Sequence, residues 1–276
     1  MFSPFSREGR GVHTGRIATV QVEVGPPGSG VVFVCQMGEI PASPDTLSAS
    51  GERATSLEFE GRIVRTVEHL LSALVMAGER DVRLTLEGGD EVPILDGGAE
   101  RWMQALLDHG AKENVAFVEI GEEVRVRRGD SYARLTPVRE QRPPTYAVYL
   151  DFEEYGLGTQ HICFRPGADS FFSDIAPART FALLEEIEEL WSRGLARGGD
   201  LESALVIGKQ GVVNPGGERF ENEPARHKML DAIGDLSLLG GLPFADLHLE
   251  KPGHHLLHEL VVKASTCCRP SKGEDR

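Results

Sequence analysis

His227 and Asp231 are residues of the types that bind metal ions, and they lie four positions apart in the segment 226–235. If this segment is helical, residues four apart are neighbours on one face, so the imidazole and the carboxylate can reach one divalent cation. A surface hydrogen bond or a weak ion pair between them explains the spacing equally well. Two ligands do not make a catalytic zinc site, which takes three protein ligands and keeps one position open.

A third ligand is offered by the sequence Val-Glu-His-Leu-Leu at 67–71. His69 could bind the ion while the adjacent Glu68 handles a proton of the attacking water, as a metal hydrolase requires. Taken alone, the Glu68-His69 pair is better explained without a metal. Glu68 would be an acidic residue favoured by the dipole of a helix N-terminus, and His69 a hydrogen-bonded histidine behind it. The metal hypothesis therefore depends on all three candidate ligands together.

Two more charged residues lie in the same segment as Asp231. Lys228 would point to another side of the helix, where its ammonium could meet a phosphate or a developing oxyanion; a solvated lysine is the alternative. Asp235 lies one helical turn beyond Asp231 and could accept the ring N–H of an imidazole, which fixes the tautomer. Considered alone, Asp235 is better explained by a helix cap or an exposed salt bridge.

Three histidines follow Gly253. His254 and His258 are four apart and could form a second metal pair, but no His-Glu-x-x-His motif accompanies them. The preceding glycine places His254 at an exposed helix start, where its imidazole can act as a general acid. We expect this role for His254, and we expect His255 and His258 to be ordinary polar or partner-facing residues.

Two shorter segments could also contact a ligand. Thr180 precedes an expected helix and is most simply an N-cap, although its hydroxyl could donate to an oxyanion and Phe181 could stack on a sugar or base. The glycine-rich segment 9–15 carries His13 at the tip of a tight loop. It has neither the ending of a P-loop nor the spacing of a dinucleotide fingerprint, so it is either a ligand contact or a plain hairpin loop.

The composition excludes several classes of protein. The chain has 276 residues and a formal net charge of -14 at pH 7, which argues against general binding of nucleic acid or of an anionic membrane. No apolar run approaches the ~20 residues of a membrane span, and the first residues lack the apolar core of a signal peptide. We therefore expect a cytoplasmic protein without stable membrane insertion. Four cysteines form no CxxC pair, and we expect free thiols at Cys35, Cys163, Cys267 and Cys268.

The elements that must hold these residues alternate between strand and helix patterns. Residues 16–35 alternate apolar and polar positions around a Pro-Pro-Gly turn, which predicts a pair of strands. Apolar residues at helical spacing predict helices at 67–77 and 100–107, with a strand at 82–86 between them. The first half is therefore mixed α and β.

A polar stretch after 108 predicts a boundary between two α+β units of comparable size, 1–112 and 117–276, with the linker near 110–116. The second unit begins with further alternation of apolar and polar residues. Its strand patterns lie near 115–126, 132–135, 145–152 and 160–165, and its helix patterns lie near 182–193, near 224–239 and after 253.

In their order along the chain, these segments resemble the motifs of a bacterial family, the UDP-3-O-acyl-N-acetylglucosamine deacetylases of lipid A synthesis (LpxC). The likeness spans nearly the whole chain, and its most specific part is the helix motif at 226–236. The segments that resemble the family are Gly-Val-His-Thr-Gly (11–15), Thr-Val-Glu-His-Leu (66–70), Pro-Ile-Leu-Asp-Gly (93–97), Ala-Arg-Thr-Phe (178–181), Arg-His-Lys-Met-Leu-Asp-Ala-Ile-Gly-Asp-Leu (226–236) and Gly-His (253–254).

The resemblance implies an α+β fold of two related sheet-and-helix sandwich domains, with the active site in the cleft between them. It implies that His69, His227 and Asp231 bind Zn²⁺. The substrate would be UDP-3-O-acyl-N-acetylglucosamine, and the reaction would release acetate.

The same resemblance assigns the proton transfers. Glu68 would be the general base toward water, and the Thr180 hydroxyl would help to hold the oxyanion. His254, charged and oriented by Asp235, would protonate the leaving amine. Because the base must be ionised and the acid protonated, a bell-shaped pH dependence is expected.

The resemblance also implies contacts to the rest of the substrate. His13, Phe181 and Lys228 match positions that meet the nucleotide-sugar, and the segment 183–213 would form an apolar passage for the acyl chain. The residues after His254 depart from the family pattern, which leaves open whether His254 or His255 is the general acid.

The sequence therefore predicts a zinc amidohydrolase that deacetylates UDP-3-O-acyl-N-acetylglucosamine in the cytoplasm, as a monomer. Two alternatives remain. One is a zinc deacetylase of another N-acetyl sugar, and the other is a non-catalytic module that binds a metal or a sugar nucleotide.

Overall fold

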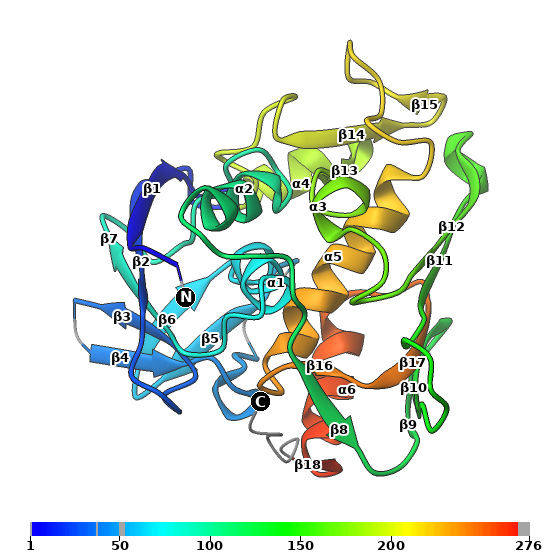
Figure 1. Cartoon of the computed structure of the whole chain (residues 1–276). Coiled ribbons are helices and arrows are strands. Elements are labelled where there is room, and N and C mark those ends of the chain that lie inside the picture. Colours follow the sequence, from blue (N-terminus) through cyan, green and yellow to red (C-terminus); the bar gives the residue numbers. More distant parts are fainter. Residues whose placement is uncertain (1, 37, 50–52, 270–276) are drawn as a thin grey trace.

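The computed structural model of the chain describes residues 2–36, 38–49 and 53–269. Two five-stranded sheets lie on opposite sides of the molecule, with helices between them (Figure 1). The central pair of helices is α1 (Glu68–Met76) and α5 (Glu223–Ser237), which pack against each other. The predicted α+β class is confirmed. No helix in the described ranges combines the length and the apolar character needed to cross a bilayer.

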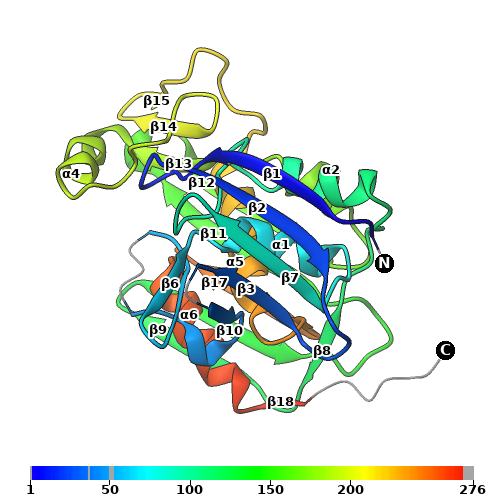
Figure 2. The same cartoon turned by 90° about the vertical axis from the view of Figure 1, so that its left-hand side faces the viewer.

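The first sheet has the strand order β1-β2-β7-β3-β4 (Figure 2). Its strands alternate buried and exposed residues, as in β2, where Val20 and Val22 face the core. The core side is covered by α1 and by α2 (Glu100–Asp108), which contacts α1. The strands are β1 (Phe5–Arg10), β2 (Ile17–Val24), β3 (Val31–Cys35), β4 (Gly38–Pro41) and β7 (Val82–Glu87).

The predicted pairing of the two strands within 16–35 is wrong, although both strands exist. β7 lies between β2 and β3, antiparallel to the first and parallel to the second. Asp81, just before β7, explains this arrangement, because its carbonyl accepts the N–H of Gly25 at 2.8 Å and its side chain accepts the N–H of Gly30 at 2.9 Å. Both ends of the Pro-Pro-Gly turn are therefore bonded to the entry of β7 rather than to each other.

The second sheet has the order β12-β11-β17-β10-β9. Helix α5 packs against β11 and β12, and α6 (His254–Ser265) packs against β9 and β10. The strands are β9 (Val124–Arg128), β10 (Ser131–Pro137), β11 (Tyr146–Phe152), β12 (Gly158–Phe164) and β17 (Ala245–Glu250). The two sheets lie on either side of the predicted boundary near 110–116 in the sequence; the boundary itself stays a prediction.

Smaller elements complete the fold. A hairpin of β5 (Ser56–Phe59) and β6 (Arg62–Arg65) precedes α1. A short sheet joins β8 (Phe117–Ile120) to β16 (Leu242–Pro243) and β18 (Cys268–Arg269), and α3 (Phe171–Asp174) follows β12 in the chain. The four cysteines are free, as predicted.

The segment 183–213 forms a small separate layer with a three-stranded sheet of β13 (Thr180–Leu183), β14 (Ala204–Gly208) and β15 (Gly211–Val212). The helix predicted over 182–193 is therefore wrong in its first part. Residues 180–183 pair in parallel with β14, and the helix α4 covers only Ile187–Ser192. Thr180 accordingly lies in a strand and is not an N-cap.

The helices α1 and α5 approach closely at Gly234. A Cβ added to this glycine would lie 2.1 Å from the backbone carbonyl oxygen of Glu68, which is closer than any real contact. Only glycine lets the two helices meet here. This crossing places Glu68 and His69 opposite the residues on the preceding turns of α5.

Candidate active site

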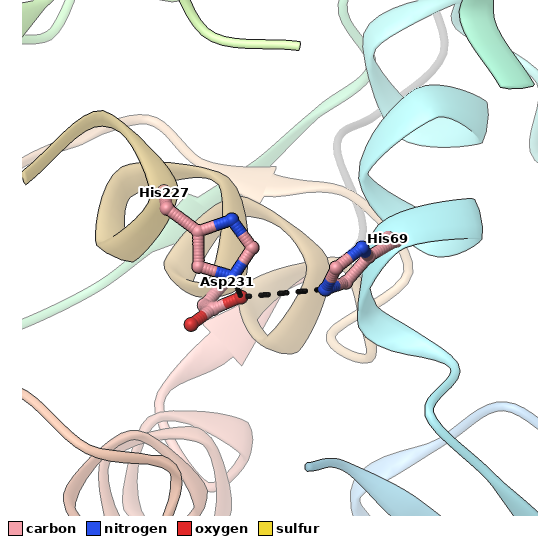
Figure 3. Close-up of side chains that lie close together, drawn as sticks. All are labelled: His69, His227 and Asp231. Carbon is pink, nitrogen blue, oxygen red and sulfur yellow. Dashed lines mark ion pairs between the residues drawn. The ribbon is translucent and has the colours of Figure 1, made fainter. Parts of the chain in front are cut away.

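His69 from α1 and His227 and Asp231 from α5 converge on one point (Figure 3). The Nε2 atom of His227 lies 3.2 Å from Oδ1 of Asp231, and Nε2 of His69 lies 3.9 Å from the same oxygen. All three side chains are buried. The structure thus brings together residues that are more than 150 positions apart in the sequence, within reach of a single cation.

Backbone carbonyls fix the orientation of both imidazoles. Nδ1 of His69 lies 3.1 Å from the carbonyl oxygen of Gly98, and Nδ1 of His227 lies 3.0 Å from that of Ala178. A carbonyl can only accept, so each Nδ1 carries the proton and each Nε2 presents a lone pair. Burial lowers the pKa of His69 to about 3 and also lowers the pKa of His227, which keeps both rings neutral as metal ligands must be.

Asp231 supplies the third donor atom. Its Oδ1 is buried and has no hydrogen-bond partner among the described residues. Two nitrogen lone pairs therefore face an unpaired carboxylate oxygen, an arrangement that a divalent cation satisfies and that protein groups alone leave unsatisfied. The site fits a metal ion on this observation.

Lys228 was predicted to point to another side of the helix than the candidate metal ligands. It points toward the site instead. Its Nζ lies 2.7 Å from Oδ2 of Asp231 and 5.3 Å from the centre of the Phe181 ring. Burial raises the pKa of Asp231, but the positive charges of Lys228 and His254 outweigh burial and hold that pKa well below its usual range. Asp231 therefore stays ionised, with Oδ2 bound to Lys228 and Oδ1 free for a cation.

Glu68 lies beside the three candidate ligands and is buried. Its Oε2 accepts the backbone N–H of Thr55 at 3.0 Å, and its Oε1 lies 3.9 Å from Nε2 of His254. Burial raises the pKa of Glu68 to about 8. A carboxyl group with one free oxygen and a pKa near neutrality is suited to proton transfer.

His254 is the first residue of α6, as predicted, but it is buried rather than exposed, with a relative accessibility of 7%. Its Nδ1 lies 3.0 Å from Oδ2 of Asp235, and its Nε2 lies 3.7 Å from Oδ2 of Asp231. Burial lowers the pKa of His254, but the carboxylate of Asp235 outweighs burial and the pKa rises to about 9. The neighbouring His255 is exposed, so the geometry singles out His254.

Sequence reasoning missed Thr55, which touches several of these groups. Its hydroxyl contacts Oδ1 of Asp235 and lies 2.8 Å from Nε2 of His258. His258 is thus not the ordinary polar residue that was expected. Thr55 carries no motif, and its partners in α5 and α6 are about 180 to 200 positions away, so no local pattern could reveal it.

Glu91 was also missed. Its carboxylate accepts the backbone N–H groups of His13 at 2.8 Å and Thr14 at 2.7 Å, and the hydroxyl of Thr66 at 3.0 Å. This buried carboxylate holds the loop 9–15 against the first sheet. A carboxylate that binds backbone N–H groups stabilises the loop. Residues 11–16 connect the antiparallel strands β1 and β2, so the segment is a hairpin loop, one of the two readings that the sequence allowed.

A polar cavity of about 450 Å³ opens over the candidate ligands. It is lined by residues from both halves of the chain, including Glu68, Thr180, Phe181, Lys228, His254 and His255. The site was predicted to lie between the two halves of the chain, and both halves contribute residues to this cavity.

A second, more apolar cavity of about 270 Å³ is lined by the segment 183–213 together with residues of the loop 11–16 and of β13. Its walls include Ile187, Leu190, Trp191 and Val206, and His13 also lines it. The two cavities share Arg53, Thr180 and Phe181, so they adjoin. A ligand with a polar head and an apolar chain could occupy both.

Comparison with known proteins shows the family of this chain. The family model for UDP-3-O-acyl N-acetylglycosamine deacetylase (LpxC) matches residues 1–265. A UDP-3-O-acyl-N-acetylglucosamine deacetylase of Syntrophotalea carbinolica is 36% identical, over 94% of this chain and 85% of the relative. Proteins of the same name from Myxococcus xanthus and a Nostoc species are 39% and 37% identical, over 94% and 92% of this chain and 83% and 93% of each relative. The chain therefore belongs to the UDP-3-O-acyl N-acetylglycosamine deacetylase family.

Proposed function

We propose that this chain hydrolyses the N-acetyl group of UDP-3-O-acyl-N-acetylglucosamine and releases acetate, a step of lipid A biosynthesis. The observation that carries this function is the convergence of His69, His227 and Asp231 beside Glu68 and His254, at the junction of a polar and an apolar cavity. Family membership adds the identity of the substrate.

Zinc is the proposed ion, with His69, His227 and Asp231 as its ligands. Two imidazole nitrogens and one carboxylate oxygen form a donor set typical of catalytic zinc, which keeps a further position open. Bound there, zinc would act as a Lewis acid that lowers the pKa of water toward ~7 and polarises the amide carbonyl.

Glu68 is the proposed general base. Its Oε2 is held by the N–H of Thr55, which leaves Oε1 to take a proton from the attacking water. Thr180 lines the polar cavity, and its hydroxyl is the proposed donor to the carbonyl oxygen as negative charge develops on it.

His254 is the proposed general acid. Asp235 accepts a hydrogen bond from Nδ1–H, so the protonated Nε2 faces the cavity and can pass its proton to the departing nitrogen as the acetyl C–N bond breaks. Water thus adds to the acetyl carbon, and the glucosamine leaves as an amine.

The remaining contacts to the substrate would be made by residues that line the two cavities. Phe181 and Lys228 line the polar cavity, where they would meet the nucleotide-sugar, and His13 lies at the apolar cavity. The apolar cavity within 183–213 is the proposed site of the acyl chain. We further propose two domains, 1–112 and 117–276, in a monomer that works in the cytoplasm.

Acetate release from acylated and unacylated UDP-N-acetylglucosamine, together with metal analysis, tests this function. We expect bound zinc and a strong preference for the acylated substrate. Equal rates on both would favour a deacetylase of another N-acetyl sugar. Substrate binding without any acetate release would favour a binding module.

A further inference from the structure

Thr55 lies between the two groups that flank the candidate metal ligands. Its backbone N–H donates to Oε2 of Glu68 at 3.0 Å, while its hydroxyl faces Asp235, His254 and His258. The residue is fully buried, with a relative accessibility of 0%. One residue thus touches both the proposed base and the pair proposed to act as the acid.

The chemistry of the partners sets the direction of each hydrogen bond. A carboxylate can only accept, so the single hydroxyl proton of Thr55 is donated to Oδ1 of Asp235, its shortest contact. The hydroxyl oxygen then accepts the Nε2–H of His258 at 2.8 Å. The other oxygen of Asp235 accepts the Nδ1–H of His254 at 3.0 Å.

This chain of bonds gives each oxygen of Asp235 one donor in a fully buried place. Without the Thr55 hydroxyl, Oδ1 would lose its donor, and a buried carboxylate oxygen without a partner is unfavourable. Asp235 would then turn toward other donors or compete for the proton of His254. Either change would disturb the orientation of the His254 ring and the proton on its Nδ1.

We propose that Thr55 is a positioning residue for the deacetylation: its hydroxyl, held by His258, fixes Asp235 so that His254 keeps its proton on Nδ1 and turns Nε2 to the cavity. The backbone of the same residue holds Glu68 in place. This inference rests on the proposed function, because it assigns Thr55 to the reaction through the proposed acid.

The alternative is that the hydroxyl merely satisfies a buried network and affects stability alone. Thr46 provides a matched control, because it is also buried and its hydroxyl bonds to the carbonyl oxygen of Pro41 at 2.6 Å, within its own turn. Replacing either threonine by valine removes one buried hydroxyl with little change in shape.

The test compares Thr55→Val, Thr55→Ser and Thr46→Val for kcat, KM, metal content and the proton resonance of the His254 Nδ1–H. This resonance is assigned by its loss in His254→Gln. We expect Thr55→Val to lower kcat about 10- to 100-fold, a part of the contribution of a general acid, with KM and metal content unchanged. The resonance should shift or vanish. Thr55→Ser should restore both properties, and Thr46→Val should change neither.

The inference is overturned if Thr55→Val and Thr46→Val have equal kcat, or if the His254 resonance is the same in Thr55→Val as in the wild type. If Thr55→Val does not fold, the test uses His258→Phe, which removes the donor to the Thr55 hydroxyl. An unchanged His254 resonance in that variant would also overturn the inference. Absence of acetate release by the wild type would overturn the proposed function instead, and the resonance would still test the role of Thr55.

Discussion

Nε2 of His227 and Oδ1 of Asp231 lie 3.2 Å apart in a buried place, and neither atom carries a proton to share with the other. The imidazole proton is on Nδ1, where it faces the carbonyl oxygen of Ala178, and the carboxylate is ionised by Lys228 and its other neighbours. A lone pair facing a carboxylate oxygen is repulsive unless a cation lies between them. Metal binding should therefore contribute to stability as well as to catalysis.

Removal of the metal is expected to lower the melting temperature, because an ion that binds only the folded state stabilises it by mass action. Dialysis against a chelator, followed by thermal unfolding with and without added Zn²⁺, measures this effect. His227→Ala should remove both the bound metal and the response to Zn²⁺. His248→Ala is the control, since His248 bonds to Glu250 on the second sheet, and it should keep both. An equal response to Zn²⁺ in both variants would contradict the assigned ligands.

Glu68→Ala is expected to retain the metal but to lose turnover by something like ~100- to 10,000-fold, the usual contribution of a general base. Metal content and kcat of the purified variant measure this. Glu68→Gln is the closer match, because its amide oxygen can still accept the N–H of Thr55. Loss of metal in both variants would mean that Glu68 is itself a ligand, and the assigned roles would be wrong.

The pH dependence of kcat/KM should be bell-shaped. Glu68 acts as an anion, so activity should rise with pH as this carboxyl loses its proton; burial raises its pKa to about 8. His254 acts as a cation, so activity should fall as pH passes its pKa of about 9. A bound dication favours the ionised form of Glu68 and should move the acidic limb below pH 8. The His254→Gln variant should lose the alkaline limb, and a flat wild-type profile through this range would contradict the pairing.

The parts of the site that were predictable from the sequence are local. The spacing of His227 and Asp231 needs only a helix, and the predicted helix 224–239 matches α5. Glu68 and His69 likewise begin a helix that apolar periodicity had located at 67–77. Such contacts within a single turn follow from helical geometry, whatever the rest of the fold does.

The features of the fold and the site that could not be predicted depend on contacts between segments distant in the sequence. β7 lies between β2 and β3, where Asp81 accepts hydrogen bonds from both ends of their connecting turn, and no alternation of apolar residues encodes this insertion. Thr55 lies just before a short hairpin, and its role depends on its partners in α1, α5 and α6, which are far away in the sequence or in other elements. The predicted helix 182–193 overlaps the end of the strand at 180–183, whose partner β14 begins some twenty residues later and gives no local signal.

The apolar cavity should set the preference for acyl-chain length. Ala182 lines this cavity, so Ala182→Phe should fill part of it and exclude methylene groups, each worth ~0.8 kcal/mol when buried. We expect kcat/KM for a long-chain substrate to fall about tenfold or more, with a short-chain substrate little affected. Val213→Phe is the control, because Val213 lies in the same layer but is 48% exposed. Equal losses on both substrates would place the acyl chain elsewhere.

The close approach of Gly234 to the carbonyl oxygen of Glu68 leads to a prediction about the stability and metal affinity of the site. Gly234→Ala gains up to ~1 kcal/mol in helix propensity, but the new Cβ would lie 2.1 Å from a backbone oxygen that cannot rotate away. Overpacking of this kind costs about 1–3 kcal/mol, so the clash wins and α5 must move away from α1. That movement separates His69 from His227 and Asp231, so the free energy of unfolding and the affinity for the metal should fall together.

Chemical denaturation and a zinc titration measure the two effects. Gly216→Ala, where a Cβ would meet no atom within 4 Å, should change neither. If the two variants behave alike, the crossing of α1 and α5 does not set the geometry of the site.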